Sequence, residues 1–160
     1  MRRAVIITGS ILLNACQVSV VHKEPVEPVR TAPADVEFVL PSGASASLPF
    51  SPVVRVGKVL YLSGQLGTNP ATGALVPGGI AAETRQAMQN IQDLVIANGS
   101  SMDRVVKCTV MLADISEWAA MNAVYVTFFP THKPARSAFG TSGLARNGRA
   151  EIECIAIAGG

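Results

Sequence analysis

The residues best suited to chemistry in this sequence are one arginine and two glutamates in its C-terminal part. Arg136 follows Pro134 at the start of a β-rich run, and Glu151 and Glu153 open the last such run. The arginine guanidinium is a planar fork that binds a carboxylate through two parallel hydrogen bonds. A nearby carboxylate can take a proton from water and return it to a leaving amine. Together these groups suit the addition of water to a C=N bond, whose carbon is already electrophilic and mainly needs positioning.

The sequence lacks the motifs that mark several other kinds of catalytic or binding site, and those kinds of site are therefore excluded. It contains no Gly-x-Ser-x-Gly, no phosphate-binding glycine loop, no His-Glu-x-x-His and no Cys-x-x-Cys. The three cysteines and two histidines are too scattered for a structural zinc site. We therefore expect neither a metal nor a cofactor.

Spacing alone does not make these residues a catalytic site. An arginine and a glutamate on neighbouring strands are more often a cross-strand ion pair. Glu151 and Glu153 are two residues apart, and side chains alternate along a strand, so both would point to the same face. The pattern therefore does not choose between the two glutamates.

Hydrophobic periodicity predicts an α+β domain. Apolar residues recur every three or four positions from Ile80 until Asn98-Gly99, which predicts a helix ended by a glycine cap. The other predicted elements are strands at 53–56, 59–63, 105–112, 135–139 and 150–158 and a second amphipathic helix at 117–129, with 36–40 as a candidate first strand. The order ββαβαββ predicts a mixed sheet with both helices on one face.

Six short motifs of this sequence stand in the order that they have in the RidA/YjgF family, which the chain resembles over about residues 36–158. The motifs are Leu48-Pro49-Phe50-Ser51, Leu62-Ser63-Gly64-Gln65, Asn69-Pro70-Ala71-Thr72-Gly73, Val105-Val106-Lys107-Cys108-Thr109-Val110, Pro134-Ala135-Arg136-Ser137 and Glu151-Ile152-Glu153. The Pro-Ala-Arg-Ser motif, with Glu-x-Glu fifteen residues after its arginine and Ser-Gly-Gln upstream, is a specific combination.

The resemblance implies a chorismate mutase-like fold and a homotrimer with its sites between subunits. It also implies hydrolytic deamination of reactive 2-imino or enamine acids, such as 2-iminobutanoate and 2-iminopropanoate, to 2-oxo acids and ammonia. By position, Arg136 matches the arginine that binds the substrate carboxylate, and Glu151 matches the glutamate that positions water. Ser63 and Asn122 match polar residues that line the family's pocket. Glu153 would then be a strand or interface residue.

Two positions depart from the family's pattern. Phe50 stands where active deaminases usually have a tyrosine, so a hydroxyl that could order substrate or water is absent. Ala138 stands where many members have a cysteine, whose thiol hydrolysis does not require. Because of Phe50 a second interpretation stays open, in which the same fold is a non-catalytic module that binds a small carboxylate.

The first residues are typical of an export signal. Met1-Arg2-Arg3 is followed by an uncharged apolar run at 4–13 that is too short to span a bilayer. Leu13-Asn14-Ala15-Cys16 resembles a bacterial lipobox, although Asn14 departs from it. We expect a signal peptide at 1–16, lipidation of Cys16, a proline-rich linker at 17–35 and a RidA-like domain at 36–160. The protein would then be exported and periplasmic, with a lipid anchor as its membrane contact. Plain secretion and a buried N-terminal strand are the alternatives.

Charge argues against a nucleic-acid partner. Without Arg2 and Arg3, eleven basic residues balance eleven acidic ones, which leaves no broad positive surface.

Cys108 and Cys154 fall in predicted strands, where they are either separate small hydrophobes or, in an exported protein, a disulfide. Trp118 is interpreted as core or trimer packing, like the pair Phe128-Phe129.

Overall fold

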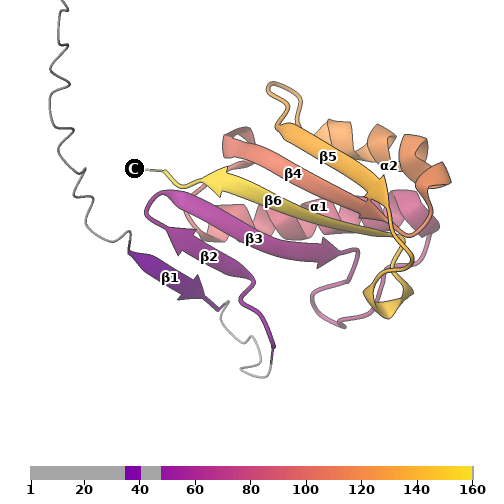
Figure 1. The fold of residues 1–160 in the computed structure, drawn as a ribbon, viewed down its shortest axis with the longest axis horizontal. Helices are drawn as coiled ribbons and strands as arrows, with labels where there is room; N and C mark the ends of the chain where they lie inside the picture. The colour runs from indigo at the N-terminus through magenta and orange to yellow at the C-terminus, as the bar shows by residue number, and fades with distance from the viewer. Residues whose placement is uncertain (1–34, 41–47, 160) are drawn as a thin grey trace, which may run out of the picture. The chain divides into compact units, whose positions relative to one another are not determined.

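The structure is a computed structural model that describes residues 35–40 and 48–159. These residues form a six-stranded sheet, and two helices cover one of its faces (Figure 1). In chain order the elements are β1 (Val36–Val39), β2 (Val53–Val56), β3 (Val59–Leu66), α1 (Gly79–Ala97), β4 (Val105–Leu112), α2 (Trp118–Tyr125), β5 (Ala135–Gly140) and β6 (Ala150–Ile157).

The strand order in the sheet is β1-β2-β3-β6-β4-β5. Only β4 and β5 run parallel, and every other neighbouring pair is antiparallel. This is the mixed sheet that the α+β pattern predicted. The candidate strand at 36–40 is confirmed, because β1 pairs with β2 at one edge and adds a strand to the order ββαβαββ.

The core lies between the sheet and the helices. The buried side of α1 includes Ile80, Met88, Ile91 and Val95, which follow the predicted helical spacing. Gly99 has φ +71°, and this left-handed conformation ends the helix as glycine allows.

The second helix is shorter than the range 117–129 predicted for it. The α-helix covers Trp118–Tyr125, and 3-10 turns precede it at Ile115–Glu117 and follow it at Val126–Phe128. The first turn is fixed by Asp114, whose side chain accepts a hydrogen bond from the Ser116 amide. At the other end the chain leaves the helix before Pro130, in agreement with the bias of residues that precede proline away from helical backbone.

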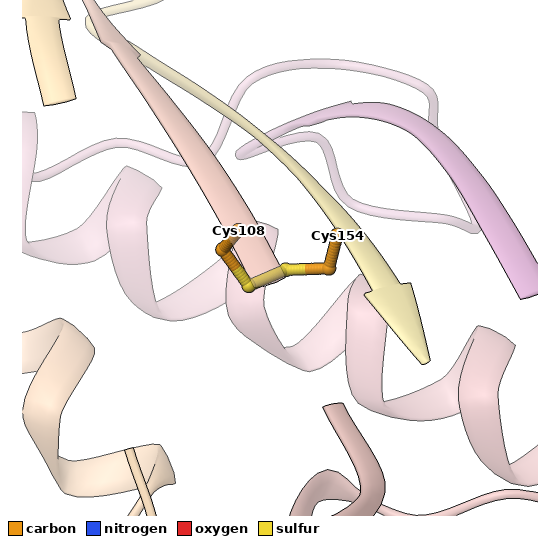
Figure 2. The surroundings of a disulfide bond; sticks show 2 residues. All are labelled: Cys108 and Cys154. Atoms are coloured by element: carbon orange, nitrogen blue, oxygen red, sulfur yellow. A yellow bond between two sulfur atoms is a disulfide. The ribbon is translucent and has the colours of Figure 1, made fainter. Parts of the chain in front are cut away.

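Cys108 and Cys154 are joined by a disulfide between β4 and β6 (Figure 2). The two residues are direct partners in the antiparallel register, and both side chains are buried on the helix-covered face. The alternative that they are two separate small hydrophobes is therefore wrong. Strand pairing brings together residues that lie 46 positions apart, which no local pattern could specify.

The predicted signal peptide, Cys16 and nearly all of the linker lie outside the described residues. Within the part of the chain that the structure describes, no helix combines the length and the hydrophobicity needed to cross a bilayer.

Candidate active site

Arg136 lies on β5 and is held by side chains of α2. Its Nη1 donates a hydrogen bond to Oδ1 of Asn122 at 2.8 Å. Its guanidinium carbon lies 4.7 Å from the ring centre of Tyr125 and 5.5 Å from the ring of Trp118. The three helix residues are spaced by four and three positions, so one face of α2 presents them all. With Lys133 and others they line a hollow of about 330 Å³.

Tyr125 contributes its ring rather than its hydroxyl to this hollow. The residue is only 4% exposed, and its hydroxyl finds no hydrogen-bond partner among the described residues. Burial raises the pKa of Tyr125 to about 12, although the charge of Arg136 acts in the opposite direction. The phenol is therefore neutral at physiological pH and presents an aromatic face to the guanidinium.

Glu151 lies near the start of β6 and lines a second, larger hollow of about 770 Å³. Phe50, Gly64, Asn69 and Arg146 are among the other residues of its wall. The pairing of β3 with β6 shifts register just here, between Leu62 and Gln65. Such irregularities are common beside active sites, where they redirect side chains.

Ser63 supports the hollow without lining it. Its hydroxyl donates to the carbonyl of Ser51 at 2.7 Å, and its amide donates to the carbonyl of Pro52 at 3.0 Å. Both bonds hold the segment that contains Phe50, whose half-exposed ring faces the Glu151 hollow. The structure thus places Phe50 in the wall of the hollow that Glu151 lines, Ser63 against the segment that contains Phe50, and Asn122 beside Arg136.

A loop with left-handed backbone borders the same hollow. Arg146 and Asn147 both have φ +59°, a conformation that non-glycine residues adopt only at a cost. The Arg146 side chain donates to the carbonyl of Gly73 and so ties this loop to the one that follows β3. Sequence reasoning did not identify Arg146.

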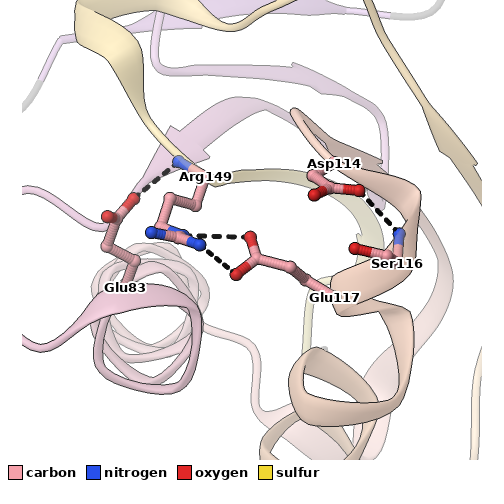
Figure 3. A network of polar contacts seen from close by, with 5 residues as sticks. All are labelled: Glu83, Asp114, Ser116, Glu117 and Arg149. Atoms are coloured by element: carbon pink, nitrogen blue, oxygen red, sulfur yellow. Dashed lines mark hydrogen bonds and ion pairs between the residues drawn. The ribbon is translucent and has the colours of Figure 1, made fainter.

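A polar network anchors the chain just before β6 (Figure 3). The buried Glu83 of α1 accepts a hydrogen bond from the Arg149 amide at 2.7 Å. The Arg149 guanidinium in turn donates two hydrogen bonds to the carboxylate of Glu117, one from Nε at 2.9 Å and one from Nη2. Hydrogen bonding to Glu117 raises the pKa of Arg149, and hydrogen bonds from Ser116 lower that of Asp114. Arg149, two positions before Glu151, is thereby tied to α1 and to the 3-10 turn that precedes α2.

Arg136 and Glu151 point to opposite faces of the sheet. Arg136 is level with the buried Cys108 on β4, so it lies on the helix-covered face. Glu151 is level with Met111, an odd number of residues further along β4, which puts it on the open face. The two residues lie two strand spacings apart across the sheet and three residues apart along the strands. Their Cα atoms are therefore separated by about 14 Å. They are therefore neither an ion pair nor, within one chain, the two sides of one small-molecule site.

Comparison with known proteins decides the family. The family model described as Endoribonuclease L-PSP matches residues 41–158, most of the chain. The chain belongs to the RidA/YjgF family.

Curated members of the family include close relatives of this chain. It is 47% identical over 111 residues to the 2-iminobutanoate/2-iminopropanoate deaminase of Capra hircus, with 69% of this chain and 81% of that protein covered. The human protein of the same name is 41% identical over 111 residues, with the same shares covered.

Solved structures of the RidA/YjgF family have the same fold. YyfA from Yersinia pestis, described as a Rid family protein of unknown function, superposes with a TM-score of 0.71 at 34% identity. The superposition covers 77% of this chain and 99% of YyfA. TdcF of E. coli, solved with bound serine, gives a TM-score of 0.67 at 31% identity and covers 71% of this chain and 91% of TdcF.

Sequence reasoning missed the two aromatic residues around Arg136. The sequence pattern indicates packing for Trp118 and assigns no role to Tyr125, yet both rings lie against the guanidinium. Their spacing from Asn122 on the predicted helix was a usable signal, because residues three and four apart share a face. No such signal existed for Glu83 or Arg149, which meet only through the tertiary fold.

Proposed function

We propose that this protein hydrolyses reactive 2-imino or enamine acids to 2-oxo acids and ammonia. The observation that carries the proposal is the guanidinium of Arg136, held by Asn122 and two aromatic rings. Its remaining N–H groups suit the carboxylate of a 2-imino acid. Relatives at 41–47% identity are named as deaminases of such acids, and a relative has been solved with serine, a small amino acid, bound.

In this reaction Glu151 takes a proton from water as the water oxygen bonds to the imine carbon. The C=N bond becomes a single bond, and Glu151 passes the proton it took from water to the nitrogen, which gives a carbinolamine. Glu151 then takes the hydroxyl proton as the C=O bond forms and the C–N bond breaks. It returns this proton to the leaving nitrogen, so that ammonia departs and the carboxylate is restored. The positive fork of Arg136 holds the carboxylate and so orients the imine carbon toward the water.

The complete site lies between subunits of a homotrimer in this proposal. Within one chain Arg136 and Glu151 are on opposite faces, so one substrate can meet both only if a second chain supplies one of them. The open face of the sheet also presents apolar side chains, including Tyr61 and Phe139 at 47% exposure each. Large apolar side chains exposed on a sheet face without helices are typical of a surface that another subunit covers.

Co-expression of two inactive variants tests the shared site. Arg136→Ala and Glu151→Gln chains each lack one half of every site in their own homotrimers. Random mixing in a trimer should restore about one quarter of the sites, because one interface in four joins an intact arginine to an intact glutamate. Activity of the mixture that equals the sum of the separate variants would contradict an intersubunit site.

The reaction itself is tested by ammonia release from freshly generated 2-iminopropanoate. Wild-type protein should accelerate it, and Arg136→Lys should fail nearly as badly as Arg136→Ala, because an ammonium lacks the planar two-point grip. The expected loss in kcat/KM is about thirtyfold to several thousandfold, as for a charge-assisted contact of 2–5 kcal/mol. Carboxylate binding without any turnover would make the protein a binding module instead.

We also propose that the protein is exported and that Cys16 is lipidated. The Cys108–Cys154 disulfide supports export, since disulfides persist mainly in oxidising compartments. Mass spectrometry of membrane-purified protein should show an acylated N-terminal cysteine. An intact Met1 would contradict export, and a free N-terminus at another residue would contradict lipidation.

A further inference from the structure

Two aromatic rings surround the Arg136 guanidinium, although binding a carboxylate requires only its N–H groups. Asn122 accepts one of the five N–H groups of the guanidinium, and no other hydrogen bond from it is found among the described residues. Its centre lies over the ring of Tyr125 and near that of Trp118, at 4.7 and 5.5 Å. These distances are within the range of cation–π attraction.

We propose that Tyr125 and Trp118 are positioning residues that fix the plane of the Arg136 guanidinium for a substrate carboxylate. This inference rests on the proposed function and states how Arg136 is oriented before the substrate carboxylate binds. Aromatic faces hold the planar cation without using its N–H groups, so the edge not bonded to Asn122 stays available for a bidentate contact. A guanidinium already held in its bound orientation loses less conformational entropy when the carboxylate arrives.

The ring of Tyr125, and not its hydroxyl, performs this role. The hydroxyl is buried and has no partner among the described residues, so a ligand in the hollow does not reach it. The neutral ring, in contrast, lies directly under the guanidinium. Phenylalanine should therefore replace Tyr125 in function, whereas leucine should not.

Trp118 offers an independent test because its side chain is 41% exposed and is the only tryptophan of the chain. Its replacement by leucine removes one ring with little loss of buried core. In proteins that keep Trp118, its fluorescence should change when a carboxylate binds to the neighbouring arginine.

The experiment measures binding of 2-oxobutanoate, a stable 2-oxo acid, by calorimetry, together with KM and kcat for 2-iminobutanoate. Tyr125→Leu and Trp118→Leu should each raise both Kd and KM about three- to thirtyfold, as for a lost cation–π contact. Their kcat should stay near the wild-type value, because a carboxylate grip acts equally on the bound substrate and its transition state. Tyr125→Phe should retain the affinity that Tyr125→Leu loses.

Phe38→Leu is the matched control, since Phe38 is an aromatic residue on β1 with 68% exposure and lies outside the Arg136 hollow. Melting temperature and oligomeric mass are measured for every variant, and Trp118→Leu decides if Tyr125→Leu does not fold. Unchanged Kd in the folded leucine variants would overturn the inference, and so would equal losses in Tyr125→Phe and Tyr125→Leu. Wild-type protein that binds 2-oxobutanoate without hydrolysing imines would refute the proposed function but leave this binding test valid.

Discussion

The backbone of Gly64 lies directly against the carboxylate of Glu151. A Cβ atom built on Gly64 would overlap Oε1 of Glu151 and would lie 3.0 Å from its Cγ. Glycine therefore leaves the space in which the carboxylate sits, at the point where β3 changes register against β6. The carboxylate of Glu151, the proposed base, can occupy its position only because Gly64 has no side chain.

Gly64→Ala should displace the Glu151 carboxylate and lower turnover while the fold persists. The atoms that must move are the end of a flexible side chain, so the melting temperature should change little. A misplacement of about 1 Å can cost up to a hundredfold in rate, and we expect a loss of about ten- to a hundredfold in kcat.

Gly67→Ala is the contrasting control for that variant. Its Cβ would meet the backbone of Glu83 at 2.5 Å, where nothing can give way cheaply. It should therefore lose stability rather than turnover. A Gly64→Ala protein with wild-type kcat would show that the carboxylate needs no such space.

The two glutamates of β6 should differ in kinetic effect although they share the open face. Glu151→Gln preserves the shape but removes the base, so kcat should fall about a hundredfold or more. Glu153 lies on the wall of a different hollow with Tyr61 and Lys107, and Glu153→Gln should stay within a few-fold of wild type. Steady-state kinetics of both variants would contradict the assignment if Glu153→Gln were the more damaging.

Phe50→Tyr should raise kcat/KM. The half-exposed ring of Phe50 lines the Glu151 hollow, and a hydroxyl there can order substrate or water. One added hydrogen bond of about 1 kcal/mol corresponds to about fivefold. The control is Phe38→Tyr on β1, which should have no effect. Equal activity of Phe50→Tyr and wild type would show that the missing hydroxyl is no handicap.

Loss of the Cys108–Cys154 disulfide should lower the free energy of unfolding by about 3–4 kcal/mol. The bond closes a loop of 46 positions, and for such a loop the chain-entropy model gives about 4 kcal/mol. Denaturant unfolding with and without reductant measures the difference. A Cys108→Ala, Cys154→Ala double variant should have the free energy of unfolding of the reduced wild type, and reductant should not change it. Identical unfolding of oxidised and reduced wild type would contradict a stabilising role.

Tyr125 should make stability depend on pH in the alkaline range. Its pKa is raised in the folded protein to about 12 from the ordinary 10.0. The unfolded chain therefore releases this proton first, and the free energy of unfolding should fall as pH rises from about 10 to 12. The slope contributed by one proton is at most about 1.4 kcal/mol per pH unit.

Tyr125→Phe should remove that part of the alkaline slope. Tyr61→Phe is the control, since Tyr61 is the only other tyrosine and is half exposed. Chemical denaturation of the three proteins at several pH values separates the contribution of Tyr125 from those of lysines and arginines. Parallel curves for wild type and Tyr125→Phe would contradict the raised pKa.

Much of the fold could be predicted from local patterns. The spacing of apolar residues located both helices, and β-rich runs located the strands, since periods of 3.6 and 2 are properties of single segments. Element ends were less well predicted, as β3 runs on to Leu66 and the α-helix of α2 stops at Tyr125. Arg136, Glu151 and their family were recognisable because the motifs that contain them are short and contiguous.

The sequence by itself determined the family and the order of helices and strands, and it singled out Arg136 and Glu151 as the proposed site residues. Only the tertiary structure decided that Arg136 and Glu151 face opposite sides of the sheet and that Cys108 meets Cys154. It also brought the rings of Trp118 and Tyr125 to the guanidinium on β5. The physical reason is register: each strand's alternation is local, but which residue of β4 is level with which residue of β5 or β6 depends on pairings formed across the folded chain.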